Sequence, residues 1–184
     1  MEGGESFDSV SLRAVTRAAG VVPTAFYRHF ASMDELGLAL VEESFRTLRA
    51  MLREAREQPV PADIIRRSVQ ILTAHVRTHR QHFAFVARVR SGGNTVLRHA
   101  IRNEVRLFTS ELATDLARFE VLRTWSTEDL MMLAGSLVNT MIATIEAMLD
   151  VPVAAPEAHD EIVRTAEKQL RLTILAVPHW RSGA

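Results

Sequence analysis

The sequence contains no cysteine and few aromatic residues, which make up 6% of the chain. Without cysteine there is no disulfide and no thiolate nucleophile, and this composition fits a reducing cytoplasm. The sequence also lacks the G-x-S-x-G, H-E-x-x-H and G-x-x-x-x-G-K motifs of hydrolases, metalloproteases and nucleotide-binding enzymes. We therefore expect that the protein is not an enzyme, and we expect no cofactor.

An excess of charge of either sign is also missing, because 22 basic residues balance 22 acidic ones. Zero net charge argues against a protein that coats nucleic acid through bulk electrostatics. The 184 residues, 47% of them hydrophobic, suffice for one large or two small cores. The sequence shows neither a leader-like segment nor an apolar stretch of bilayer length, which predicts a soluble, cytoplasmic protein.

Positive charge is instead concentrated between Ser11 and Met33, where there are three arginines and no acid, whereas acidic residues resume at Asp34. In the same stretch Ser11 is a good N-cap for a first helix. Gly20 supplies the left-handed residue that ends a helix and allows a tight reversal, and Pro23 fits the first turn of the next helix. This arrangement is typical of a DNA-reading helix-turn-helix.

In the second of these helices Val22, Phe26 and Phe30 fall at helical spacing and are predicted to face inward. The residues between them are predicted to face solvent, with Thr24 and Ala25 near base edges and the larger side chains near phosphates. The predicted DNA-binding residues are Ser11, Arg13, Thr24, Ala25, Tyr27, Arg28 and His29. The alternative interpretation is an ordinary helical hairpin with a solvated, arginine-bearing face.

Three segments carry a resemblance to a known family. The segment SLRAVTRAAGVVPTAFYRHFASMDELGLALVEES resembles the DNA-binding segment of the TetR family of bacterial repressors. Within it, VPTAFYRHF and MDELGL resemble the branch that represses unsaturated fatty-acid synthesis and desaturation genes. The segments RVRSGGNTVLRHAIRNEVRLFTSELATDLARFE and WSTEDLMMLAGSLVNTMIATIEAMLD resemble the ligand domain of that branch. The resemblance implies a dimeric, ligand-responsive transcriptional repressor that binds an operator in double-stranded DNA.

The chain departs from the family pattern at its N-terminus. In the family a further helix precedes the position of FDSVSL, packs on the helix-turn-helix and touches phosphates, whereas here only Met1 to Ser6 precede Phe7. We interpret this as a start placed downstream of the true one, with a shortened product as the alternative. An incomplete head is expected to expose apolar surface on the second and fourth family helices. Each Å² of apolar surface left in water costs roughly 25 cal/mol of folding free energy. A second departure is Met33, where many members place a phosphate-contacting lysine.

The rest of the chain has helical periodicity interrupted by breaks, with no alternating strand pattern. Ser32 and Glu35 form a capping box that opens a long helix, which Pro59 and Pro61 end. Further helices are predicted over residues 62–77, 81–90, 94–119, 127–150 and 157–177. The prediction is an all-α protein with two domains. A helix-turn-helix DNA-binding domain, lacking its first family helix, covers residues 1–48, and a helical effector-binding and dimerisation domain covers 49–184.

The helix predicted over 127–150 carries two apolar stripes, and both must be covered. One stripe is expected to close the core of its own domain and the other to meet a second subunit, because helix-turn-helix proteins bind half-sites about 34 Å apart as two-fold dimers. TetR-like proteins pair through their last two helices, which implies an interface that includes Val138, Ile142, Leu149, Leu170 and Ile174. The alternative is that both stripes face the core of one subunit.

In the branch that the chain resembles, the ligand domain senses long-chain acyl thioesters in an apolar tunnel between helices. The resemblance therefore implies a small apolar effector such as a long-chain acyl-CoA. The candidate tunnel residues are large or flexible apolar side chains on helices expected to converge: Phe83, Val86, Phe108, Leu112, Leu137 and Met141. The alternative is that these residues are plain core.

Two further patterns carry less weight. Gly92 and Gly93 would let backbone amides approach a phosphate of coenzyme A, but a turn that ends a helix is the simpler explanation. His75, His79 and His82 recur at a helical spacing that suits a metal. No metal site is expected, because the neighbouring arginines repel a cation and no carboxylate joins the histidines.

Overall fold

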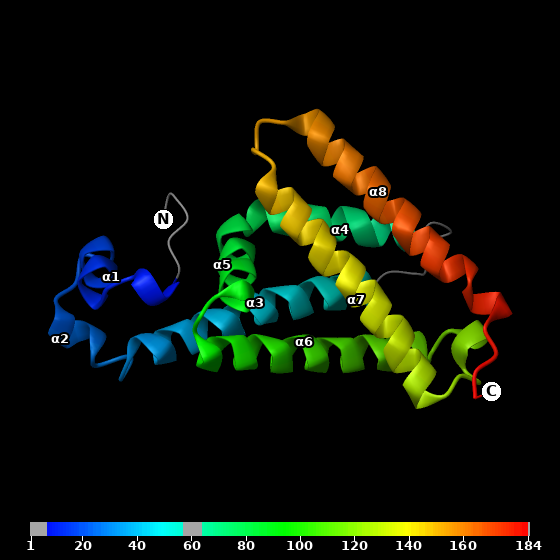
Figure 1. Cartoon of the computed structure of the whole chain (residues 1–184), viewed down its shortest axis with the longest axis horizontal. Helices are drawn as coiled ribbons and strands as arrows, with labels where there is room; N and C mark the ends of the chain where they lie inside the picture. Colours follow the sequence, from blue (N-terminus) through cyan, green and yellow to red (C-terminus); the bar gives the residue numbers. More distant parts are fainter. Residues whose placement is uncertain (1–6, 57–63, 184) are drawn as a thin grey trace. The chain divides into compact units, whose positions relative to one another are not determined.

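The computed structural model describes residues 7–56 and 64–183, and every regular element in these ranges is a helix. This confirms the predicted all-α fold. The elements are η1 (Phe7–Ser9), α1 (Leu12–Ala18), α2 (Pro23–Phe26), α3 (Met33–Arg56), α4 (Ile64–Thr78), α5 (Arg80–Ser91), α6 (Thr95–Leu116), η2 (Glu120–Leu122), α7 (Thr127–Asp150), α8 (Pro156–Leu175) and η3 (Val177–His179) (Figure 1).

The ends of α5, α6 and α8 agree with the prediction to within three residues, and α7 agrees at both ends. Ser126 caps α7 as its side chain accepts a hydrogen bond from the Asp129 amide at 3.1 Å. The capping box of α3 is also present, because Ser32 Oγ accepts from the Glu35 amide at 3.1 Å and the Glu35 carboxylate accepts from the Ala31 amide. The two prolines predicted to end α3 lie outside the described residues.

The chain forms two compact units, which α3 and α6 both enter. The first unit contains residues up to Leu48 together with 81–104, and the second contains 49–80 and 105–184. The predicted domain boundary after residue 48 stays a prediction. In the structure, residues 81–104 group with the residues up to Leu48, which we call the head.

The contact between the head and residues 81–104 depends on a close approach at Gly37. A Cβ atom on Gly37 would lie 2.6 Å from a terminal methyl group of Leu97, which is fully buried. The Asn94 side chain donates to Asp34 Oδ1 at 2.8 Å and so joins the residue before α6 to the first turn of α3. The rings of Phe7 and Phe85 also meet edge to face, with centroids 5.6 Å apart.

In the second unit α7 and α8 pack against each other, and both contact α4. One buried cluster joins α6, α7 and η3, with the short η2 over it: Ala113, Leu116, Leu122, Leu130, Leu133, Ala134 and Val177. A smaller cluster of Val69, Ala166 and Leu170 joins α4 to α8. Each large aliphatic side chain buried in this way contributes roughly 1.5–3 kcal/mol, so these clusters hold the inner face of α7 and α8 in place.

Both ends of α7 are bonded to distant parts of the chain. At its C-terminal end the Arg80 guanidinium donates to the carbonyl oxygens of Met148 at 2.9 Å, of Leu149 at 2.7 Å and of Val151 at 3.1 Å. These are carbonyls that a helix end leaves without an internal donor, and a cation there also interacts favourably with the helix dipole.

At the N-terminal end of α7 the C-terminal tail folds back onto Asp129. Asp129 Oδ2 accepts hydrogen bonds from the hydroxyls of Ser182 and Ser126 and from the Gly183 amide. The Ser182 hydroxyl, followed by that of Ser126, lowers the pKa of Asp129 below its ordinary value of 3.8, because these bonds favour the ionised form. The tail is therefore held by a carboxylate that stays ionised in mild acid.

Helix α7 is long and apolar enough, by length and composition alone, to cross a membrane. The sequence-based expectation that no stretch has these properties is thus wrong for α7. Only 28% of its most apolar 18-residue window is buried inside the chain. Most of this apolar window is therefore left uncovered by the rest of the described chain.

Candidate nucleic-acid interface

The tight turn between α1 and α2 is built by Gly20. Its φ of +67° is the left-handed conformation predicted from the sequence. The Gly20 amide donates to the Arg17 carbonyl at 3.2 Å and the Val21 amide to the Thr16 carbonyl at 2.9 Å. This pair of bonds is the Schellman motif, which satisfies two carbonyls at the end of α1 and sends the chain back toward α2.

The start of α1 also follows the prediction. The Ser11 side chain accepts a hydrogen bond from the Ala14 amide at 3.2 Å, which makes Ser11 the N-cap. Its hydroxyl proton is not used by that bond, and the residue is exposed, so it can still donate to a phosphate oxygen. Arg13, one turn into α1, is exposed as well.

The second helix is shorter than the sequence suggests, because regular α-helix covers only Pro23–Phe26 and the chain continues in turns to His29. Phe26 is buried and Phe30 half-buried, as predicted, but Val22 is 63% exposed. The prediction for Val22 is wrong because this residue is the N-cap, with φ −81° and ψ 153°. Its extended backbone takes it off the helical face that the i, i+4 spacing assumes.

The structure presents most of the predicted DNA-contacting residues of this segment to solvent. Thr24, Arg28 and His29 are exposed, and Tyr27 is 59% exposed with the edge of its ring against Phe26. Ala25 differs from the prediction because it is half-buried. The surface therefore offers hydroxyl, guanidinium and imidazole groups, which are the side chains that donate to phosphate oxygens.

The charge of this surface is uniformly positive among the described residues from Ser11 to Met33. Arg13, Arg17 and Arg28 are all exposed, and the segment contains no acidic residue. Negative charge begins again at Asp34, whose carboxylate is bonded to the Asn94 side chain. A polyanion approaching α1 and α2 therefore meets arginines first.

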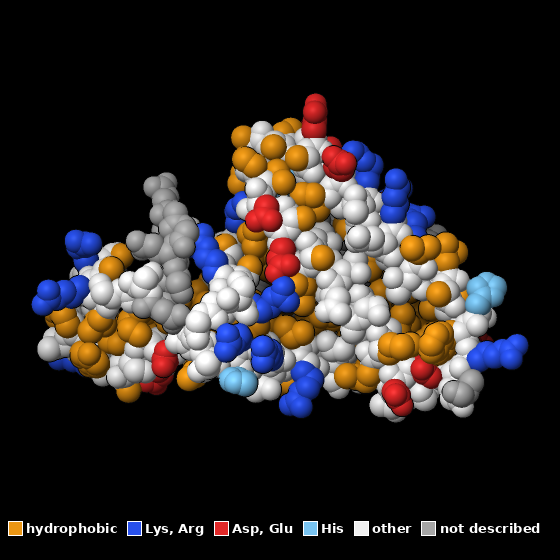
Figure 2. Space-filling view, in the orientation of Figure 1, with side chains coloured by type: hydrophobic (Ala, Val, Ile, Leu, Met, Phe, Trp, Pro, Cys, Tyr) orange, Lys and Arg blue, Asp and Glu red, His pale blue; other side chains and the backbone are white. Residues whose placement is uncertain are grey.

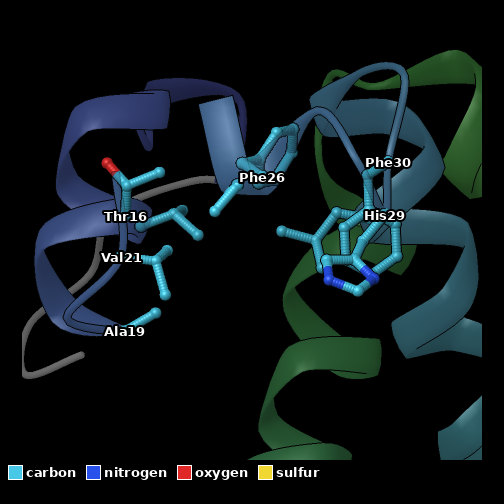
Figure 3. Close-up of a pocket in the computed structure, with 9 residues that line it drawn as sticks. Thr16, Ala19, Val21, Phe26, His29 and Phe30 are labelled. Atoms are coloured by element: carbon cyan, nitrogen blue, oxygen red, sulfur yellow. The ribbon is translucent and has the colours of Figure 1, made fainter. Parts of the chain in front are cut away.

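An apolar hollow of about 250 Å³ lies within the head. Figure 3 shows Ala19 and Val21 on one side of the hollow and His29 and Phe30 on the other. Its remaining walls come from α1, α2 and the first turn of α3: Val15, Thr16, Ala25, Phe26 and Leu36. The apolar surface expected on the second and fourth family helices of an incomplete head stays a prediction.

The bond between Asn94 and Asp34 was not predicted. The sequence identifies Asn94 as the residue before a helix, and its side chain does accept from the Leu97 amide at 3.0 Å. Its second bond joins residues 60 positions apart, and no local pattern signals such a pair. The same holds for the contact of Gly37 with Leu97, although an isolated glycine inside a helix is a known sign of close approach.

Two comparisons with protein families agree with this geometry. Residues 3–40 match the family described as bacterial regulatory proteins, tetR family, and residues 61–173 match the tetracyclin repressor-like C-terminal domain. The chain belongs to the TetR family. It is accordingly a TetR-type transcriptional regulator with a DNA-binding helix-turn-helix and a ligand-binding domain. TetR regulators are soluble DNA-binding proteins and not enzymes, so the composition of α7 is weak evidence for a membrane span.

The residues predicted to bind a ligand in this TetR-type chain are divided between the two units. Phe83 and Val86 lie in the first unit, where Phe83 is buried and Val86 half-buried. In the second unit Phe108 is buried, and Leu112, Leu137 and Met141 are half-buried. Leu112 and Leu137 pack against the cluster that joins α6 to α7.

The predicted dimer-interface residues fall into two groups. Val138 and Leu170 are buried inside the chain, and Leu170 belongs to the cluster between α4 and α8. Ile142 and Leu149 are half-buried, and Ile174 is 37% exposed. Three further apolar side chains, which were not predicted to lie in the interface, are exposed on α7 and α8: Met132, Leu172 and Leu175.

The predicted absence of a metal site concerns His75, His79 and His82. The Nδ1 atom of His75 lies 3.2 Å from the Ile71 carbonyl, so this nitrogen donates to the backbone. The rings of His75 and His79 are 6.0 Å apart. Within residues 7–56 and 64–183 no group of three or more histidines and carboxylates is placed to hold a metal ion.

Proposed function

We propose that this TetR-type regulator is a repressor that binds its operator as a dimer through the surface formed by α1 and α2. Arg28, His29 and Tyr27 are assigned to backbone phosphates, with Arg13 and Ser11 at the start of α1, while the exposed Thr24 is assigned to base edges. The observation that carries the proposal is the exposed, uniformly positive surface beside the Gly20 turn. Phosphate contacts set the position of such a protein on the duplex, and the few base contacts give specificity.

A gel-shift titration against labelled DNA from the chain's own upstream region tests this proposal. Sequence-selective binding is expected, with unrelated competitor DNA displacing the protein only in excess. Arg28→Gln should weaken binding to all sequences about equally, as removal of a phosphate contact does. It should also reduce the slope of log K against log salt concentration by about one per bound chain. The exposed Arg77→Gln variant, on α4 of the other unit, serves as the control. Binding that is unaffected by Arg28→Gln would contradict the assignment.

The proposed dimer explains why the apolar helix α7 is so little covered. Met132 on α7 and Leu172, Ile174 and Leu175 on α8 leave apolar surface exposed, and these two helices pack against each other. A second copy of the chain is the proposed cover, with Val138, Ile142, Leu149, Leu170 and Ile174 in or beneath the interface. Sedimentation velocity should give a dimer, and Ile174→Glu should shift the protein toward the monomer because it places a charge in an apolar contact. A monomeric wild-type protein would exclude this arrangement.

The proposed effector is a small apolar molecule of the acyl-CoA type, and the proposed targets are genes of fatty-acid or lipid metabolism in the cytoplasm. The residues proposed to contact it are all apolar: Phe83 and Val86 in the first unit, and Phe108, Leu112, Leu137 and Met141 in the second. Such a ligand changes DNA binding only if it binds one spacing of the two heads more tightly than the other. Mass spectrometry of lipids that copurify with the protein tests the ligand class directly. A long-chain acyl-CoA should raise the melting temperature while free coenzyme A does not; the opposite pattern would rule out an apolar ligand.

A second candidate function is a helical ligand-binding or dimerising protein with weakened DNA binding. The apolar hollow between α1 and α2 favours it, because an incompletely filled head holds its recognition segment less firmly. The gel shift separates the two functions. No selective binding by this chain, combined with selective binding by a version extended at its N-terminus, would assign the weakness to the head.

A further inference from the structure

A second group of basic side chains lies outside α1 and α2. Residues 81–104 contain four arginines and one acidic residue. Arg88 and Arg90 near the end of α5 are exposed, as are His99 and Arg102 on the first three turns of α6. Figure 2 shows basic side chains gathered over this part of α5 and α6. We call Arg88, Arg90, His99 and Arg102 the α5–α6 patch.

The patch belongs to the same compact unit as the helix-turn-helix. The bond from Asn94 to Asp34 and the contact between Leu97 and Gly37 fix the start of α6 against the first turn of α3. That turn follows the recognition segment directly in the chain. The patch is therefore held in a defined position relative to the surface that is proposed to bind the operator.

The turn between α5 and α6 is also ordered from within. Arg98 Nη1 donates to the Gly92 carbonyl at 3.1 Å, and Arg98 Nε is buried without a hydrogen-bond partner in the described residues. Arg98 thus stabilises the turn through its bond to the backbone. Arg88 and Arg102, in contrast, have no ion-pair partner among the described residues. Positive charge outweighs the single acidic residue of this segment, Glu104, so the partner that such a patch favours is a polyanion.

We propose that the α5–α6 patch is a second DNA-contacting surface, in which Arg88 and Arg102 bind backbone phosphates beyond those contacted by α1 and α2. This inference rests on the proposed DNA binding of the head and extends its footprint along the duplex. The patch offers long, flexible guanidinium groups on helix surfaces, which suits phosphate contacts and not the reading of base edges. Its contribution is therefore independent of sequence and sensitive to salt.

The test uses the full chain and a fluorescently labelled duplex from its own upstream region, with affinities measured by anisotropy over a range of salt concentrations. The variant is Arg88→Gln/Arg102→Gln, and the matched control is Arg77→Gln/Arg123→Gln, which removes two exposed arginines from the other unit. Each phosphate contact contributes about 0.9 to the slope of log K against log salt concentration. In a dimer the variant should lower the slope by about 2–4 while the control leaves it unchanged.

The outcomes separate the two proposals. If the wild-type protein and its N-terminally extended form both fail to bind selectively, the proposed function fails and the patch loses its basis. If Arg28→Gln abolishes binding while Arg88→Gln/Arg102→Gln keeps the wild-type slope, the head binds DNA and the second surface is refuted. An equal fall in the control also refutes it, because the effect would then reflect total charge. If Arg88→Gln/Arg102→Gln keeps the wild-type slope of log K against log salt concentration but no longer binds coenzyme A, the second DNA-contacting surface is refuted. The patch is then assigned to a small phosphate-bearing ligand instead.

Discussion

Replacing Gly20 with alanine isolates the contribution of one backbone conformation to the head. Gly20 has φ +67°, and a Cβ atom placed on it would meet nothing within 4 Å. The substitution therefore creates no clash with its surroundings, and its cost is the strain of an L-residue in the left-handed region, about 1–2 kcal/mol. Alanine also restricts the unfolded chain, which offsets about 0.4–1 kcal/mol. The expected net loss in the free energy of unfolding is about 1 kcal/mol.

Urea denaturation followed by circular dichroism measures this loss as a lower midpoint at unchanged slope. In a thermal scan a loss of this size should lower the melting temperature by about 2–4 °C for a chain of this length. Gly20→Asn is the matched control, because asparagine visits the left-handed region more readily than alanine. Equal stability of Gly20→Ala and the wild-type protein, or an equal loss in Gly20→Asn, would refute the role assigned to the backbone at this turn.

Three further substitutions test other parts of the fold. Arg80→Met removes the donors to three carbonyls at the end of α7 and should cost about 2–3 kcal/mol by chemical denaturation; a cost near zero would mean that water replaces them. Leu97→Ala opens a cavity at a fully buried position and should cost about 2–5 kcal/mol and weaken DNA binding, an expectation that a stable variant would contradict. Asp129→Asn concerns pH: because the Ser182 and Ser126 hydroxyls lower the folded pKa of Asp129, its contribution is present above the unfolded pKa and is lost as pH falls through the folded pKa. Acid titration followed by tryptophan fluorescence should show this loss below about pH 4 in the wild-type protein only, and identical titrations in both proteins would exclude it.

Local signals account for most of what the sequence predicts correctly. The ends of α7 follow from Ser126, a capping residue with an acidic first turn behind it, and from the break near Pro152. The turn at Gly20 follows from the conformational freedom of glycine. In each case the physical cause lies within four residues of its effect, which is the range over which a sequence pattern is directly visible.

The remaining features depend on pairs that are far apart in the chain. No periodicity indicates that Asn94 bonds to Asp34, or that residues 81–104 group with the head in one compact unit. The error at Val22 has a different origin, because the residue has the correct spacing for the apolar face but precedes the helix by one position. Spacing defines a face only between residues that share the helical backbone, and a boundary shift of one residue removes Val22 from it.

Helix α7 shows why hydropathy alone does not decide the place of an apolar helix. Length and composition average over its whole circumference, and by that measure α7 could cross a membrane. Its faces differ, however. Leu130, Leu133 and Ala134 are buried against α6, whereas Met132 lies exposed between them in the sequence. A membrane-spanning helix gains from an apolar circumference, whereas a helix in a soluble bundle needs one inner face and one partner. Because α7 has already formed its inner face with elements of its own chain, the proposed second copy of the chain would have only the other face to cover.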